Sequence, residues 1–225
     1  YVYSYDSAGR VSRVTDLEGK VTEYSYRGGS TDVTEIRLPG GETYSYSYTE
    51  SGLLTGTSSA EGVETSHSYD GWGNVTETEI RSEGGVGAIR SGSTYTADGN
   101  FPASSTGGDG STVTYAYDTE RSVLNSVTDA LGQSTGYSYD SRRQLTNAGS
   151  GSTAVSYAYG DDRLREISHT GQTGTTYRFG YTAGGLTAAV RVGGRVLAEN
   201  GYTPGRWTLS SQSYGNGQSR SYAYN

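Results

Sequence analysis

The sequence is short of the residues that build several common kinds of protein. Its 225 residues include no Cys, no Met, three Pro, two Phe, two Trp and a single Lys. Without Cys there is no disulfide framework, no thiolate nucleophile and no cysteine-based metal site. No apolar run reaches the roughly eighteen residues of a transmembrane helix, so we expect no membrane insertion. Because an initiator Met is also missing, we expect the sequence to be a section of a longer chain.

Aliphatic residues are scarce as well. Val, Ile, Leu and Phe together account for 32 of the 225 residues, whereas Tyr alone accounts for 22 and Gly for 35. A combined share of these four residue types below roughly one fifth indicates disorder when the net charge is high. Here the net charge is −7, and packed tyrosine rings can replace much of the missing apolar area. We therefore expect a folded, tyrosine-rich protein. Its acidic balance argues against nucleic acid as a partner, because phosphate binding needs a basic face.

The tyrosines recur as Tyr-x-Tyr pairs at a regular spacing. His67 and Phe179 replace the first tyrosine in two copies, and Tyr95 and Tyr202 mark two degenerate copies. The pairs begin at residues 3, 24, 46, 67, 95, 115, 137, 157, 179, 202 and 222, so ten intervals cover 219 residues. This spacing predicts a single array over residues 1–225 of about ten repeats of about 22 residues, uncapped at both ends. The interval from 67 to 95 is longer, and its Gly/Ser-rich residues 81–93 predict a loop insertion.

Each repeat has the pattern of two strands and two turns. Asp6-x-x-Gly9 and Asp16-x-x-Gly19 carry Asp and Gly at the first and fourth positions, which is typical of a type I turn. The Tyr-x-Tyr residues share one parity and so point to one face of a strand. The abundance of Gly, Ser and Thr disfavours helix. We predict an all-β protein of about twenty short antiparallel strands. Open twisted sheets rarely exceed about ten strands, so we expect this hairpin strip to spiral into a barrel, shell or tube.

The repeat resembles a known family. The segment Tyr3–Tyr24 reads Tyr-x-Tyr-Asp-x-x-Gly-Arg-Val-x-x-Val-Thr-Asp-x-x-Gly-x-x-Thr-x-Tyr, and it resembles the YD-repeat, or Rhs-repeat, family of bacterial toxins, toxin-complex shell proteins and teneurins. The resemblance covers essentially the whole chain. It implies a strip of β-hairpins that spirals into a hollow shell, which encloses a toxic polypeptide in the toxins and scaffolds adhesion in teneurins. The Asp-Pro-rich, self-cleaving segment of the toxins has no counterpart here, so enclosure and self-cleavage are not carried over to this section alone.

The residues expected to form the structural repeat motif are the aromatic pairs and the Asp and Gly of the turns. They are Tyr3, Tyr5, Asp6, Gly9, Asp16, Gly19, Tyr24, Tyr26, Tyr69, Asp70, Gly73, Tyr115, Tyr117, Asp118, Asp129, Gly132, Tyr137, Tyr139, Asp140, Tyr157, Tyr159, Tyr222 and Tyr224.

The sequence offers little support for catalysis. Of the two histidines, His67 occupies a tyrosine position of the repeat and His169 lies in a turn-like stretch. No nucleophile elbow precedes a helical pattern. The Asp residues stand at turn positions, where their side chains bond the local backbone. We therefore predict no enzyme activity, no catalytic residue, no cofactor and no metal site.

Three functional hypotheses follow. The first is a non-catalytic section of an extracellular YD-repeat shell or tube, with flanking repeats of a longer chain and an enclosed polypeptide as partners. The second is a unit that assembles end to end with further copies into a filament. The third is an adhesion module that binds surface glycans or a receptor, with Trp72 and Trp207 as candidate ligand contacts. We expect an extracellular or cell-surface location, and the sixteen Arg against one Lys favour a bacterial source.

Overall fold

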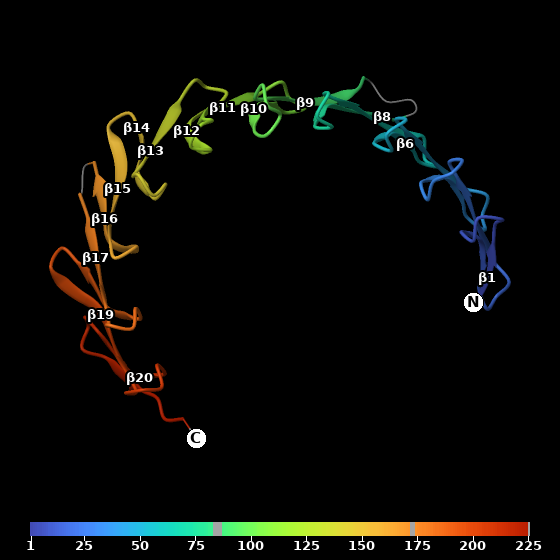
Figure 1. The fold of residues 1–225 in the computed structure, drawn as a ribbon. Coiled ribbons are helices and arrows are strands. Elements are labelled where there is room, and N and C mark those ends of the chain that lie inside the picture. Colours follow the sequence, from blue (N-terminus) through green and yellow to red (C-terminus); the bar gives the residue numbers. More distant parts are fainter. Residues whose placement is uncertain (83–86, 172–173, 225) are drawn as a thin grey trace. The chain divides into compact units, whose positions relative to one another are not determined.

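The computed structural model describes residues 1–82, 87–171 and 174–224. In this part of the chain there are 21 β-strands and no helix. Figure 1 draws the strands as arrows that follow one another along the chain. The prediction of an all-β strip of about twenty short strands is therefore confirmed. No helix among the described residues is long and apolar enough to cross a membrane.

The strands are short and follow one another closely along the chain. Their bounds are β1 Val2–Tyr5, β2 Val11–Thr15, β3 Val21–Tyr26, β4 Val33–Arg37, β5 Thr43–Tyr48, β6 Leu54–Ser58, β7 Val63–Tyr69, β8 Val75–Ser82, β9 Ile89–Tyr95, β10 Pro102–Thr106, β11 Thr112–Asp118, β12 Val123–Thr128, β13 Ser134–Tyr139, β14 Leu145–Ser150, β15 Thr153–Gly160, β16 Arg163–Thr170, β17 Thr176–Tyr181, β18 Thr187–Val192, β19 Arg195–Tyr202, β20 Leu209–Tyr214 and β21 Ser219–Ser221.

The chain divides into two compact units, Tyr1–Thr114 and Tyr115–Asn225. Within the first unit each strand pairs antiparallel with the next one along the chain, from β1 with β2 to β9 with β10. The second unit repeats this pattern from β12 to β21. Each unit is therefore a strip of consecutive hairpins.

Local chemistry closes the hairpins. In the first turn the Gly9 amide donates to the Asp6 carbonyl at 3.0 Å, and the Asp6 amide donates to the Arg10 carbonyl at 2.8 Å. Gly9 has a φ of 80°, so this is the three-residue hairpin loop in which a turn is followed by a left-handed residue. The Asp6 carboxylate oxygen Oδ1 also accepts the amides of Ala8 and Arg10, each at 2.9 Å. The side chain thus completes the turn that the backbone begins.

The two faces of the strip differ in composition. Tyr24 lies opposite Ile36, which lies opposite Tyr44, and we call this side the tyrosine face. On the other side Ser25 lies opposite Glu35, which lies opposite Ser45, and we call it the serine face. Alternate residues of a strand point to opposite faces, so the Tyr-Ser-Tyr sequence produces this difference directly.

The strip has almost no conventional core. Among the described residues, Ala189 alone falls in the buried class, at 7% exposure. Tyrosine rings on the central strands are half-buried against their neighbours instead. Each repeat is consequently stabilised by the repeats beside it, as in other solenoid-like arrays.

The loop insertion expected at 81–93 differs from the observed structure. Arg81 and Ser82 continue β8, and β9 already begins at Ile89, so these residues lengthen a hairpin. Ile80 pairs with Ile89 across it, and this apolar cross-strand pair favours continued strand over loop. Residues 83–86 of the predicted insertion lie outside the described residues.

Candidate functional site

A β-bulge recurs where each tyrosine pair ends. In β1 the register with β2 shifts between Ser4 and Tyr5, so that Tyr5 pairs with Val11. The same shift places Tyr26 opposite Val33 and Tyr48 opposite Leu54. Further copies of this bulge occur at Tyr69, Tyr139, Tyr159, Tyr181 and Tyr202. A bulge interrupts the hydrogen-bond ladder and leaves backbone groups unpaired.

The next repeat supplies the missing hydrogen bond. We call the carbonyl of the residue opposite the second tyrosine the bulge carbonyl. The Tyr26 hydroxyl donates to the Val11 carbonyl at 2.6 Å, and the Tyr48 hydroxyl donates to the Val33 carbonyl at 2.8 Å. The further pairs are Tyr69 to Leu54, Tyr95 to Val75, Tyr159 to Leu145, Tyr181 to Leu164 and Tyr202 to Thr187. The hydroxyl thus explains why tyrosine, and not phenylalanine, occupies this position.

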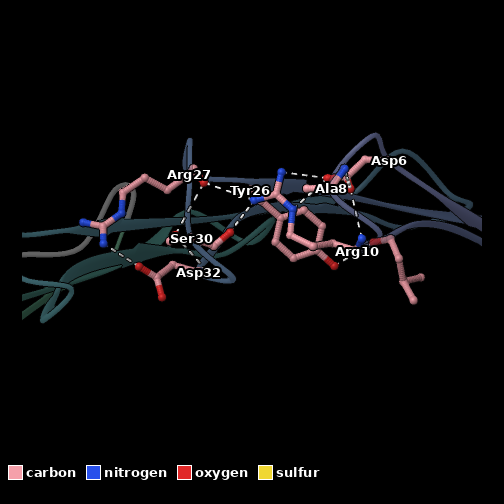
Figure 2. A network of polar contacts seen from close by, with 8 residues as sticks. Asp6, Ala8, Arg10, Tyr26, Arg27, Ser30 and Asp32 are labelled. Atoms are coloured by element: carbon pink, nitrogen blue, oxygen red, sulfur yellow. Dashed lines mark hydrogen bonds and ion pairs between the residues drawn. The ribbon is translucent and has the colours of Figure 1, made fainter.

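A second set of contacts links the hairpin turns along one edge of the strip, which we call the turn row. The Arg10 guanidinium binds the Asp6 carboxylate at 2.7 Å and donates to the carbonyls of Arg27, at 3.2 Å, and Ser30 in the following turn. It also lies 4.5 Å from the centre of the Tyr26 ring. Figure 2 shows these groups gathered around the guanidinium. One arginine therefore joins two successive turns and one tyrosine.

The following turn uses the same interaction with the charges exchanged. Arg27 occupies the position that Asp6 has in the first repeat, and it pairs with Asp32 at 2.7 Å (Figure 2). Arg27 also donates to the Thr49 carbonyl of the third turn and lies 5.7 Å from the Tyr48 ring centre. The ion pair is retained although its two residues have changed places.

Polar side chains join turns elsewhere along this edge. Asn74 donates to the Gly99 carbonyl at 2.8 Å and to the Asp70 carboxylate at 3.1 Å. In the second unit Arg121 donates to the Asp140 carbonyl. Different side chains therefore join successive turns in different repeats, and each donates to a backbone carbonyl at the first or the fourth position of the next turn.

The electrostatics of these carboxylates follow from their hydrogen bonds. The Arg10 backbone amide and then the Arg10 side chain lower the pKa of Asp6 below its usual value. On the serine face, the hydrogen bond from Arg90 lowers the pKa of Glu79. Burial raises the pKa of the Tyr48 hydroxyl. Each direction has a structural cause, and these shifts do not by themselves indicate an acid–base catalyst.

The structure places the predicted motif residues at two kinds of position. Asp6, Asp16, Asp70 and Asp129 begin turns, and the amide of Gly9, Gly19, Gly73 or Gly132 donates to the carbonyl of that Asp. Asp140 also begins a turn, but Arg143 stands where the others have glycine. Asp118 ends β11 and accepts the Arg121 amide through its carboxylate.

The aromatic motif residues lie mainly on strands. Tyr3 and Tyr5 lie on β1, Tyr24 and Tyr26 on β3, Tyr69 on β7, Tyr115 and Tyr117 on β11, Tyr137 and Tyr139 on β13, and Tyr157 and Tyr159 on β15. Tyr222 and Tyr224 follow β21 and are not part of a strand.

The two tryptophans lie at turns and are exposed, at 69% for Trp72 and 59% for Trp207. A Cβ added to Gly99 would lie 2.4 Å from the Trp72 ring, and one added to Gly184 would lie 1.9 Å from the Trp207 ring. Each indole thus packs on the glycine of a neighbouring turn while much of its surface stays open.

No catalytic constellation emerges from the described residues. His67 is hydrogen-bonded to the Thr78 hydroxyl at 3.0 Å across the hairpin, and His169 forms a T-shaped ring contact with Tyr177, with the ring centres 6.0 Å apart. Within the described part of the chain, no three His, Asp or Glu residues are grouped to hold a metal ion.

Sequence reasoning missed the bulge carbonyls and the Arg10 and Arg27 links. The available signal was the recurrence of Val or Leu fifteen residues before several second tyrosines.

Comparison with known proteins gives a family match. A family model described as Teneurin YD-shell matches residues 1–131. No curated protein matches the sequence. Among solved structures, the chain is similar to one chain of the Photorhabdus luminescens Tc holotoxin pore, with 14% identity and a TM-score of 0.39 over 94% of this chain and 12% of that one. It is also similar to a chain of the TcdB2–TccC3 crystal structure, with 12% identity and a TM-score of 0.32 over 93% and 17%. The chain therefore spans less than one fifth of either protein.

Proposed function

Because the chain belongs to the teneurin YD-shell family, we propose that it is a non-catalytic section of an extracellular shell wall that encloses a polypeptide or forms a scaffold at the cell surface. The observation that carries this proposal is the recurrence of two kinds of link between successive repeats. Tyrosine hydroxyls bind bulge carbonyls on one face, as Tyr26 binds Val11. Arginines such as Arg10 join successive turns along one edge.

These contacts suit a wall better than a catalyst. They hold a strip that is one sheet thick, with a single buried residue in its described part. Its serine face carries exposed cross-strand ion pairs such as Arg13–Glu23 and Arg191–Glu199. A hydrated face of this kind is compatible with an enclosed, incompletely folded chain. The flanking repeats of a longer chain are then the nearest partners of this section.

Protease protection tests the proposal. The natural chain that carries these repeats is purified and treated with trypsin, before and after mild denaturation of the wall. We expect any enclosed segment to survive digestion in the intact protein and to be cleaved once the wall unfolds. Immediate cleavage of every segment outside the repeats would contradict enclosure, and regular fibres in the same sample would favour the filament hypothesis.

A further inference from the structure

Trp72 occupies a turn that fixes the indole without covering it. Its backbone amide donates to the Asp70 carboxylate at 2.9 Å. One side of the ring packs on Gly99, where any Cβ would lie 2.4 Å from Cγ of the indole. The side chain is nevertheless 69% exposed. A large aromatic surface is therefore held in place and left open to solvent.

A groove lies directly beside this tryptophan. It has a volume of about 530 Å³, and Ser68, Thr76, Glu77 and Thr94 are among the residues that line it. This volume falls within the range of roughly 300–1,000 Å³ that is usual for small-ligand sites. Aromatic surface and hydroxyl groups thus meet in one concavity of the first unit.

Glu77 gives the groove a free hydrogen-bond acceptor. On the serine face it lies opposite Ser68 on one side and Gly92 on the other. Gly92 has no side chain, so this cross-strand partner offers the Glu77 carboxylate no side-chain hydrogen-bonding group. The Glu77 side chain is exposed, and no ion pair or hydrogen bond of its carboxylate is found among the described residues. Its neighbour Glu79, by contrast, pairs with Arg81 and Arg90.

We propose that this groove binds a neutral sugar chain. The apolar face of a pyranose ring would lie on the Trp72 indole, and the Glu77 carboxylate would accept hydrogen bonds from two adjacent sugar hydroxyls. No Arg or Lys lines the groove, whereas Asp70 and Glu77 do, so acidic sugars are disfavoured. A quaternary ammonium ion is best held by a cage of several rings. The aromatic residues that line this groove are Trp72 and Tyr95, and Tyr95 is held by its hydroxyl bond to the Val75 carbonyl, so the described residues do not form a full cage.

The low tryptophan content provides a direct assay. The sequence has two Trp, so Trp207→Phe leaves Trp72 as the sole indole fluorophore. This variant of the 225-residue chain is titrated with maltohexaose, cellohexaose and chitohexaose. We expect at least one hexamer to give a saturable change in Trp72 fluorescence, with half-saturation at or below roughly 1 mM.

Substitutions then locate the contact. By calorimetry, Glu77→Gln should weaken binding about tenfold, because it replaces a charged acceptor by a neutral amide. The matched control Glu35→Gln lies on the same face outside the groove and should leave affinity unchanged. Trp72→Ala should abolish binding, and its circular dichroism spectrum shows whether the strip stays folded.

The proposal is overturned by any of three results. One is the absence of a fluorescence change with all three hexamers up to roughly 10 mM. Another is unchanged affinity in Glu77→Gln, a variant that leaves the Trp72 turn intact. The third is a response to choline or to oligogalacturonate that equals or exceeds the response to the neutral hexamers.

Discussion

At the scale of single residues, the hydroxyl of the second tyrosine has a defined partner. Removing it from Tyr48 by substitution with Phe leaves the Val33 carbonyl without its 2.8 Å bond. We expect a loss of about 1 kcal/mol in the free energy of unfolding, measured by urea denaturation. Tyr46 lies on the same strand and face, and no hydrogen bond of its hydroxyl is found among the described residues. Equal losses from Tyr46→Phe and Tyr48→Phe would contradict the assigned role.

The fourth turn position requires a left-handed backbone. Arg143 adopts a φ of 63° there, whereas Gly9 adopts 80° in the first turn. L-residues other than glycine, Asn and Asp rarely accept this conformation, at a cost of roughly 1–2 kcal/mol. Arg143→Gly should therefore raise the free energy of unfolding, measured by urea denaturation, by up to about 1 kcal/mol after the added chain entropy of glycine is subtracted.

The reverse substitution provides the matched test. A Cβ added to Gly9 meets no atom within 4 Å, so Gly9→Ala tests the backbone conformation without a steric clash. We expect it to destabilise the protein by about 1 kcal/mol. If neither Arg143→Gly nor Gly9→Ala changes the free energy of unfolding, the fourth turn position does not require a left-handed backbone.

Acid should weaken the turns through their carboxylates. The backbone amide and side chain of Arg10 lower the pKa of Asp6 in the folded protein. A lowered folded pKa means that the stabilisation is fully present above the unfolded pKa, at about 4, and is lost as pH falls from there through the lower folded pKa. We therefore expect the melting-temperature difference between the wild type and Asp6→Asn to be larger at about pH 6 than at about pH 3. A difference that grows on acidification would contradict this sign.

At the scale of the turn element, the exchanged ion pair of Arg27 and Asp32 permits a charge-swap experiment. Arg27→Asp alone places two carboxylates together, and Asp32→Arg alone places two guanidinium groups together. The double variant restores the order found at Asp6 and Arg10. We expect the double variant to lose less unfolding free energy than the sum of the losses in the two single variants. The difference, which is the coupling energy of the pair, should be about 0.5–1 kcal/mol. Additive losses in urea denaturation would show that the pair contributes nothing.

How much of this could be predicted from sequence depends on how local each feature is. The Asp6–Gly9 turn is readable because its residues bond one another. The strands are readable from the alternation of tyrosine and serine. The bulge at Tyr26 and the target of its hydroxyl depend on the register between strands fifteen residues apart, which composition does not specify. The Gly and Ser residues of 81–93 predict an exposed loop, but strands β8 and β9 extend into both ends of this segment because Ile80 and Ile89 pair across it.

At the scale of the whole molecule, stability is distributed along the strip. Each hairpin pairs with its sequence neighbours within its unit, and among the described residues Ala189 alone is buried. Stability in such an array is approximately a sum of repeat and neighbour-interface terms. The scarcity of aliphatic residues is therefore a property of a thin wall, and the tyrosines compensate through hydroxyl bonds as well as ring packing.

The most direct test of the central claim is a cryo-electron microscopy reconstruction of the natural chain that carries these repeats. The account predicts a closed wall one β-sheet thick around a chamber, with the tyrosine pairs of successive repeats aligned and second tyrosines such as Tyr26 and Tyr48 bound to the bulge carbonyl of the preceding repeat. A globular core around these residues, or a solid fibre without a chamber, would contradict it.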